Sequence, residues 1–333
     1  MNKKTDNPTG VSKKLFLPDI SSMTLPEGKI TRLGTVAMYL VESTPIVWKG
    51  KLYLFMYMRA NAPKAEDLKA HYYCFFDWET GEHSKPFGEG YDLGSAFVDG
   101  GTLYVFGVKG WGTSKIYSFK SNDMMNWECS EALSLPGWAI FNTSVTKNDK
   151  GVFTLVYEVS KVQINNPDFE FAPYMCFFAE SSDLRDWRLL APEAHNFKKE
   201  KFSACPCLKY MPDGFYYMIY LEVKHGVTVP RYYGPAYYSE IARTKDFKTW
   251  EEGKRPFMGF GDPKDRTVAS NDFSPGDLKV ISEGVNINAS DVDMLEYKGK
   301  TIIMYAWGDQ VGNDHLAVAA YPGTMLQLCK SFF

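Results

Sequence analysis

The sequence contains neither a long apolar run nor an excess of basic charge. No segment of its 333 residues approaches the length that a membrane helix needs, and the net charge is only −3. A nucleic-acid-binding domain would carry a clustered positive charge, which is missing here. We therefore expect neither a membrane nor a nucleic acid as a partner, and no pattern sets the oligomeric state.

Helical periodicity is equally scarce. The best candidate is a single turn near residues 324–330. Aromatic residues are abundant instead, with 21 Tyr and 23 Phe, and such residues are enriched in strands. The sequence therefore predicts an all-β protein.

Metal-binding cysteine patterns are also missing. Only Cys205 and Cys207, of six cysteines, lie close together, and no second pair or flanking His completes a zinc site. Buried, reduced thiols are therefore expected.

The first eight residues are polar and lack the apolar core of an export signal. The chain as given is thus expected to be cytoplasmic, although a chain whose signal had been removed would look the same.

One sequence pattern occurs five times along the chain. Small or polar residues open it, an apolar run and a Gly-centred turn follow, and an aromatic-rich strand ends it on a polar residue. The copies span residues 42–59, 93–109, 142–158, 203–222 and 288–307. Hairpin units that recur with a period of about 50 to 85 residues are typical of a radial β-propeller. We predict five antiparallel, four-stranded blades.

A second repeat follows the third strand of three blades. Residues 121–127, 181–187 and 244–250 share the pattern Ser/Thr-x-Asp-x-x-x-Trp. We interpret it as an Asp-capped turn into a fourth strand, whose Trp packs against the neighbouring blade.

The fifth blade runs out of chain after its third strand. A strand around residues 35–41 would supply the fourth strand and close the ring, which removes exposed sheet edges. We therefore predict an extended N-terminal arm over residues 1–30 and a single propeller domain over residues 31–333.

These blades and turns resemble the five-bladed propellers of glycoside hydrolase families 32 and 43. The resemblance covers about residues 35–325 and implies cleavage of a glycosidic bond by two carboxyl groups. Those families place an Asp before a Pro on the first inner strand, and family 32 places a Glu in a Glu-Cys-Pro motif. Here the corresponding residues are Thr44, before Pro45, and Ala204, before Cys205. The usual acids are therefore absent from their motif positions.

Other polar residues are predicted to surround the central mouth. In a hairpin, the start of the first strand lies beside the end of the second. This rule brings together Glu42 with Arg59, Asn142 with Glu158, and Asp291 and Asp293 with Trp307 and Asp309. The remaining candidates for substrate binding are Trp111, His225 and Gln310.

The proposed catalytic pair is Glu222 and Asp293. Glu222 ends an aromatic strand, where desolvation would raise the pKa of its carboxyl and suit it to act as the acid. Asp293 is the base, with Asp291 on the same strand face. Two aligned carboxylates repel, so a shared proton, a sugar-hydroxyl clamp or a structural calcium ion are alternatives. No other metal or cofactor is expected.

Several functions are compatible with these patterns. The first is a glycosidase whose site is narrowed by two long loops, residues 159–173 and 251–285. The second is a non-catalytic carbohydrate-binding propeller, which the missing acids favour. A protein-interaction propeller would have an apolar rim instead of charges, and a phosphorylase would need a cationic pocket beyond Arg59 and Lys109.

Overall fold

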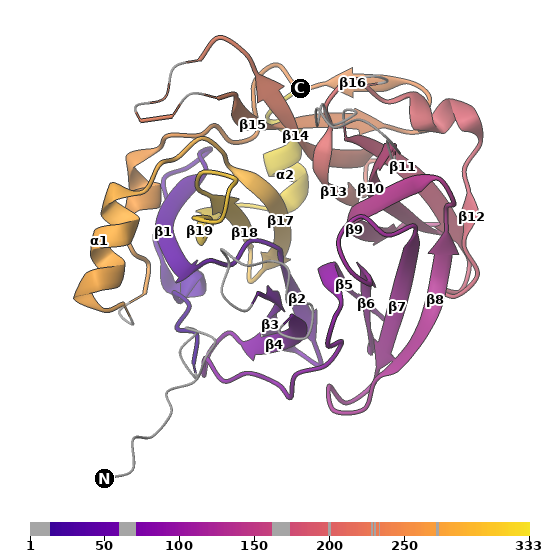
Figure 1. Cartoon of the computed structure of the whole chain (residues 1–333), viewed down its shortest axis with the longest axis horizontal. Coiled ribbons are helices and arrows are strands. Elements are labelled where there is room, and N and C mark those ends of the chain that lie inside the picture. Colours follow the sequence, from indigo (N-terminus) through magenta and orange to yellow (C-terminus); the bar gives the residue numbers. More distant parts are fainter. Residues whose placement is uncertain are drawn as a thin grey trace.

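The computed structural model is a ring of five antiparallel sheets (Figure 1). It describes residues 14–59, 71–161, 174–198, 201–227, 229, 231–232, 234–270 and 273–333. The expectations for the first eight residues, most of the 159–173 loop and residues 271–272 fall outside these ranges. None of the described helices is long and apolar enough to cross a membrane.

The blades are numbered in chain order. Blade 1 contains β2 (Ser43–Trp48), β3 (Lys51–Met58) and β4 (Tyr72–Asp77). Blade 2 contains β5 (Asp92–Asp99), β6 (Thr102–Val108), β7 (Lys115–Ser121) and β8 (Glu128–Ser134). Blade 3 contains β9 (Trp138–Lys147), β10 (Phe153–Lys161), β11 (Met175–Ser181) and β12 (Arg188–Leu189).

Two further blades complete the ring. Blade 4 contains β13 (Ala204–Tyr210), β14 (Tyr216–Lys224), β15 (Ala236–Thr244) and β16 (Trp250–Glu252). Blade 5 contains β17 (Ser290–Tyr297), β18 (Lys300–Trp307), β19 (His315–Tyr321) and β1 (Thr31–Met38). Four sheets thus have four strands, as predicted. Blade 1 has three, and isolated bridges from Tyr73 to Phe87 and from Phe76 to His83 continue its outer edge.

The predicted closure of the ring is confirmed. Strand β1 pairs antiparallel with β19, from Thr31 opposite Ala320 to Met38 opposite His315. The inner strands β2, β5, β9, β13 and β17 each contact the next one around the ring, and β17 contacts β2. The propeller therefore joins its ends through an N-terminal strand.

The repeated Ser/Thr-x-Asp turns also have the predicted structure. In blade 3, Ser181 Oγ accepts a hydrogen bond from Leu184 N at 3.0 Å, and Asp183 Oδ1 accepts one from Asp186 N at 2.9 Å. Each Trp that follows such a turn packs on the preceding blade. Trp127 stacks on Phe87 at 3.8 Å between ring centroids, and Trp187 meets the ring of Phe106 edge-on at 5.6 Å.

One helix was not predicted. Helix α1 (Pro275–Glu283) lies within the 251–285 loop, on the outside of β1 (Figure 1). The Ser274 and Asp277 side chains form a capping box, and Pro275 starts the helix, so the start signal was present in the sequence. The turn predicted near residues 324–330 is confirmed as α2 (Met325–Lys330).

Three short 3-10 helices occur in the described loops: η1 (Ile20–Ser22), η3 (Pro192–Asn196) and η4 (Pro263–Arg266). Residues 14–30 of the predicted arm pack on the ring, where Leu15 and Ile20 join the apolar core beside blades 1 and 5.

Candidate active site

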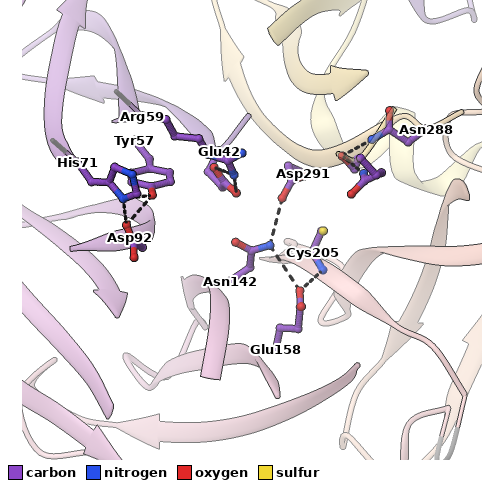
Figure 2. Close-up of polar contacts among 12 residues, drawn as sticks. Glu42, Tyr57, Arg59, His71, Asp92, Asn142, Glu158, Cys205, Asn288 and Asp291 are labelled. Atoms are coloured by element: carbon purple, nitrogen blue, oxygen red, sulfur yellow. Dashed lines mark hydrogen bonds and ion pairs between the residues drawn. The ribbon is translucent and has the colours of Figure 1, made fainter. Parts of the chain in front are cut away.

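A cavity of about 870 Å³ opens at the central mouth. Its lining comes from all five blades, because the starts of the inner strands converge there. Seven of the predicted site residues line it: Glu42, Arg59, Trp111, Asn142, Glu158, Asp291 and Gln310. The close-up in Figure 2 shows how five of them gather around the centre.

Two side chains of blade 3 and one of blade 5 connect at the floor of the cavity. The Asn142 Nδ2 atom donates to Asp291 Oδ1 at 3.1 Å and to Glu158 Oε2 at 3.4 Å (Figure 2). The backbone N–H of Cys205 donates to the same Glu158 oxygen at 2.6 Å. One amide nitrogen therefore holds two carboxyl groups toward one point.

Burial raises the pKa of the Glu158 carboxyl to about 8, and the nearby Asp291 carboxylate adds to this effect. Burial also raises the pKa of Asp291, but hydrogen bonds from Ser290 and Cys205 and the charge of Arg59 oppose that rise. Because burial raises the pKa of both carboxyl groups, a proton on one of them would relieve the repulsion between them.

A second carboxylate faces Asp291 from blade 1. Arg59 Nη2 donates to both oxygens of Glu42, at 2.7 and 2.9 Å, which confirms the predicted pairing across this hairpin. Burial raises the pKa of Glu42 to about 7 against the opposing charge of Arg59, and Asp291 raises it further. Glu42 and Asp291 therefore compete for one compensating positive charge or proton.

Backbone bulges set the direction of the side chains that lie at the starts of the inner strands. Leu93, Cys205 and Asp291 occupy matching positions in blades 2, 4 and 5, with left-handed φ values of 53°, 49° and 51°. The strand register shifts at each of these points. A bulge turns its residue away from the regular alternation of a strand. The bulge at Asp291 interrupts the regular alternation on which the expectation of one shared strand face relied, and Asp291 lines the cavity whereas Asp293 does not.

Asp293 lies below the floor of this cavity, beside a narrow space on the propeller axis that Asp291 also lines. Its Oδ1 atom is 2.6 Å from Lys209 Nζ and accepts a hydrogen bond from Met294 N at 2.6 Å. The carboxylate is thus held in a buried ion pair. Its predicted role as the base stays a prediction.

Glu222 is not among the residues that line the cavity. Its neighbours Leu221 and Val223 do line it, and successive side chains of a strand point to opposite faces. The Glu222 carboxylate instead lies 3.1 Å from Lys198 Nζ and 3.8 Å from Lys224 Nζ. The predicted acid role of Glu222 stays a prediction that this placement does not support.

The other predicted ligand-binding residues also lie apart from the cavity lining. Trp307 is fully buried, and its Nε1 donates to Thr35 Oγ1 at 2.8 Å, so its ring offers no platform to a sugar. Asp309 accepts hydrogen bonds from Val311 N and Asn313 N, both at 3.0 Å, and shapes its own loop. His225 is exposed in the turn after β14.

The prediction missed a buried polar cluster on the cavity wall of blades 1 and 2. Asp92 Oδ1 accepts a hydrogen bond from Tyr57 Oη at 2.5 Å and lies 2.6 Å from His71 Nδ1 (Figure 2). Asp314, from blade 5, also lines the cavity, and burial raises the pKa of its carboxyl to about 6.

A simple topological rule would have found several of these residues. The end of a second strand lies beside the start of the third strand as well as beside the start of the first strand. His71, Tyr174, Asp314 and Tyr237 lie at the starts of third strands and line the cavity. The predicted ring of polar residues included only the starts of first strands and the ends of second strands.

The donor set gives no support for the predicted calcium ion. Within the described ranges, no group of three or more His, Cys, Asp or Glu side chains could hold a metal ion. The ammonium group of Lys209 already compensates Asp293, and it would repel a cation. A calcium ion near Asp291 and Asp293 stays a prediction.

No protein-family model and no curated protein matches this chain. Solved structures do share its fold. A putative glycosidase from Bacteroides thetaiotaomicron is similar with a TM-score of 0.55 and 12% identity, covering 96% of this chain and 99% of that one. A putative glycoside hydrolase from Parabacteroides distasonis is similar with a TM-score of 0.54 and 12% identity, covering 95% and 98%. A thermostable family-43 glycoside hydrolase matches with a TM-score of 0.51 and 13% identity, covering 73% and 72%.

At these identities the similarity establishes the five-bladed fold. The resemblance predicted from the blade pattern is thereby confirmed as a distant structural relationship. The chemistry of this chain has to be argued from its own cavity.

Proposed function

We propose that this protein is a glycoside hydrolase that binds a carbohydrate in the central cavity, with Glu158 as the general acid and Asp291 as the base or nucleophile. The observation that carries the proposal is the shared hydrogen-bond donor, Asn142 Nδ2, between the two carboxyl groups. It directs both of them to one place in a cavity large enough for a sugar.

The separation of the two groups suits this chemistry. Because both oxygens bond to one nitrogen, at 3.1 and 3.4 Å, they cannot be further apart than the sum of these distances, 6.5 Å. Glycosidase carboxyl groups lie about 5–5.5 Å apart in retaining enzymes and about 6.5–9.5 Å apart in inverting ones. The anomeric configuration of the first product then decides whether Asp291 attacks directly or activates water.

The two roles follow from the electrostatics. With a pKa of about 8, Glu158 is mostly protonated at neutral pH. Its Oε2 atom already accepts two hydrogen bonds, so Oε1 is the oxygen that carries the proton. Glu158 would give this proton to the leaving oxygen of the glycosidic bond. Asp291, whose burial-raised pKa is opposed by its hydrogen bonds and by the charge of Arg59, would act as the carboxylate on the anomeric carbon.

A carbohydrate-binding protein without catalysis is the second candidate. It is favoured by Thr44 and Ala204, which stand where the resembling families carry acids. It would use the same cavity but would not cleave its ligand.

A screen of wild-type protein against a library of oligosaccharides and synthetic glycosides tests the two candidates. Mass spectrometry would detect products, and calorimetry would detect binding. We expect cleavage by the wild type, and binding without cleavage by Glu158→Gln and Asp291→Asn. Asn is well suited to the left-handed backbone at position 291, so the second variant should keep the fold. Tight binding of a glycan that wild type never cleaves would establish the second candidate instead.

A further inference from the structure

A continuous series of aromatic rings lines one side of the cavity. Five rings follow one another through blades 2, 3 and 4 with centroid distances of 5.2, 5.0, 5.6 and 5.7 Å. They belong to Trp111, Phe141, Tyr174, Phe202 and Tyr237, which we call the aromatic arc. All five line the cavity, and Trp111 at its outer end has an exposed fraction of 62%.

The opposite wall differs in chemistry. Blades 1 and 5 contribute Glu42, Arg59, His71 and Asp314, and Asp92 from blade 2 joins them. Hydroxyl-rich ligands need such hydrogen-bonding groups, whereas an arc of rings offers mainly apolar surface. The cavity is therefore divided between a polar half and an aromatic half.

The position of Glu158 relates this division to the reaction. Glu158 belongs to blade 3, and its charge, after burial, raises the pKa of Tyr174 in the arc. The general acid of a glycosidase protonates the oxygen of the leaving group, so the leaving group lies on the side of the acid. The sugar that is cleaved would then occupy the polar half beside Asp291, Glu42 and Arg59.

We propose that the leaving group of the natural substrate is an aromatic aglycone, bound by the aromatic arc, so that the protein acts on glycosides of aromatic alcohols or phenols. This inference rests on the proposed function for the identity of the acid. In the reaction, the aglycone oxygen would take the Glu158 proton as the C–O bond breaks, and water would supply the hydroxyl group of the released sugar.

The orientation of the rings favours an aromatic guest over a chain of sugars. Neighbouring planes in the arc are inclined by 65°, 84°, 88° and 48°. Such rings cannot form one flat platform for successive sugar faces. Aromatic groups, by contrast, pair well both edge-to-face and offset-stacked, so an aryl group finds partners in either orientation.

The test uses pairs of glycosides that differ only in the aglycone. Benzyl and methyl glycosides of each sugar cleaved in the library screen have leaving alcohols of similar reactivity, so kcat/KM compares binding of the aglycone. We expect wild type to prefer the benzyl glycoside by about tenfold, which corresponds to about 1.4 kcal/mol. Phe202→Leu and Trp111→Ala should lower this benzyl-to-methyl ratio of kcat/KM toward one. Val311→Ala, at the cavity rim on blade 5, is the matched control.

Binding of free alcohols separates this inference from the proposed function. Benzyl alcohol and the equally sized but non-aromatic cyclohexylmethanol are compared by ligand-observed NMR with wild type and Phe202→Leu. Preferential binding of benzyl alcohol that Phe202→Leu weakens, without hydrolysis of any glycoside, would support the arc as an aromatic site and refute the enzyme. Hydrolysis with a benzyl-to-methyl ratio near one, and equal binding of both alcohols, would refute the aromatic aglycone and leave the glycosidase intact.

Discussion

The outer turns and the inner-strand starts of this propeller are built on opposite principles. The turns after β7, β11 and β15 repeat the same hydrogen bonds, a left-handed residue at the same position and a Trp packed on the preceding blade. The inner-strand starts differ in every blade, with Glu42, Leu93, Asn142, Cys205 and Asp291 near the mouth. The repeated turns stabilise the ring, whereas the residues that differ between the blades line the cavity.

The largest effect is expected at the inner-strand starts, where the blades differ, and it concerns the pH dependence of stability. The pKa of Glu158 rises from about 4.5 to about 8 on folding, so the protonated form is favoured in the folded state. The stability that this pKa shift contributes to the folded state is complete below the pKa of the unfolded state and is lost as the pH rises through about 8. Each unit of pKa shift corresponds to about 1.4 kcal/mol, so several kcal/mol should disappear between pH 5 and 9.

Denaturant unfolding of wild type and Glu158→Gln at a series of pH values measures this loss. The variant carries no titrating group at this position, so its stability should fall less across the range. Parallel curves for the two proteins would show that Glu158 is not held in its protonated form.

At the repeated turns, Trp187→Ala should destabilise the fold by about 3 kcal/mol, because a buried ring that packs on Phe106 is removed. Trp111→Ala serves as the control, since its ring is mostly exposed and its loss should change stability little. Thermal unfolding compares them. Equal losses of stability would contradict the division between structural and ligand-facing tryptophans.

The bridging amide tests the site without removing a carboxyl group. Asn142→Leu would leave Glu158 and Asp291 without their shared donor and should lower kcat by about a hundredfold, or about 2.7 kcal/mol. Because Asn142 is a positioning residue, the pH profile should change too, with the alkaline limb displaced upward as the hydrogen bond that opposes the raised pKa of Glu158 is lost. An unchanged profile would reduce Asn142 to a packing role.

The smallest effect is expected for a single turn cap. Asp183→Ala removes the acceptor for Arg185 N and Asp186 N and should cost about 1 kcal/mol, with kcat unchanged. Asp186→Ala, a carboxylate lost from the same exposed turn, is the control and should cost less. If the cap variant changed activity as well, the outer turns would not be independent of the mouth.

The repeated features could be read from the sequence because each is local. Five hairpins, three Asp-capped turns and the N-terminal closing strand are encoded by short patterns, and the structure contains them all. Helix α1 was not predicted, although the residues of its capping box are present in the sequence. A nine-residue helix within a long loop shows little helical periodicity.

The site was harder to predict because it depends on backbone detail. The bulge at Asp291 breaks the alternation between it and Asp293, and the regular alternation of β14 places Leu221 and Val223 at the cavity in place of Glu222. Side-chain alternation reverses with a single step, so a mouth residue cannot be assigned from its place near a strand end alone. The aromatic arc was not predicted as a unit for another reason, because its rings come from five separate segments.

The central claim is tested most directly by the specific rate of glycoside cleavage in Glu158→Gln and Glu222→Gln, measured on one substrate. Both substitutions replace a glutamate by its neutral isostere in neighbouring blades, one inside the cavity and one in an ion pair beside it. We predict a loss of roughly 10²- to 10⁴-fold for Glu158→Gln and a rate near wild type for Glu222→Gln. The reverse result, with activity lost only in Glu222→Gln, would contradict the assignment of the acid and of the cavity as the active site.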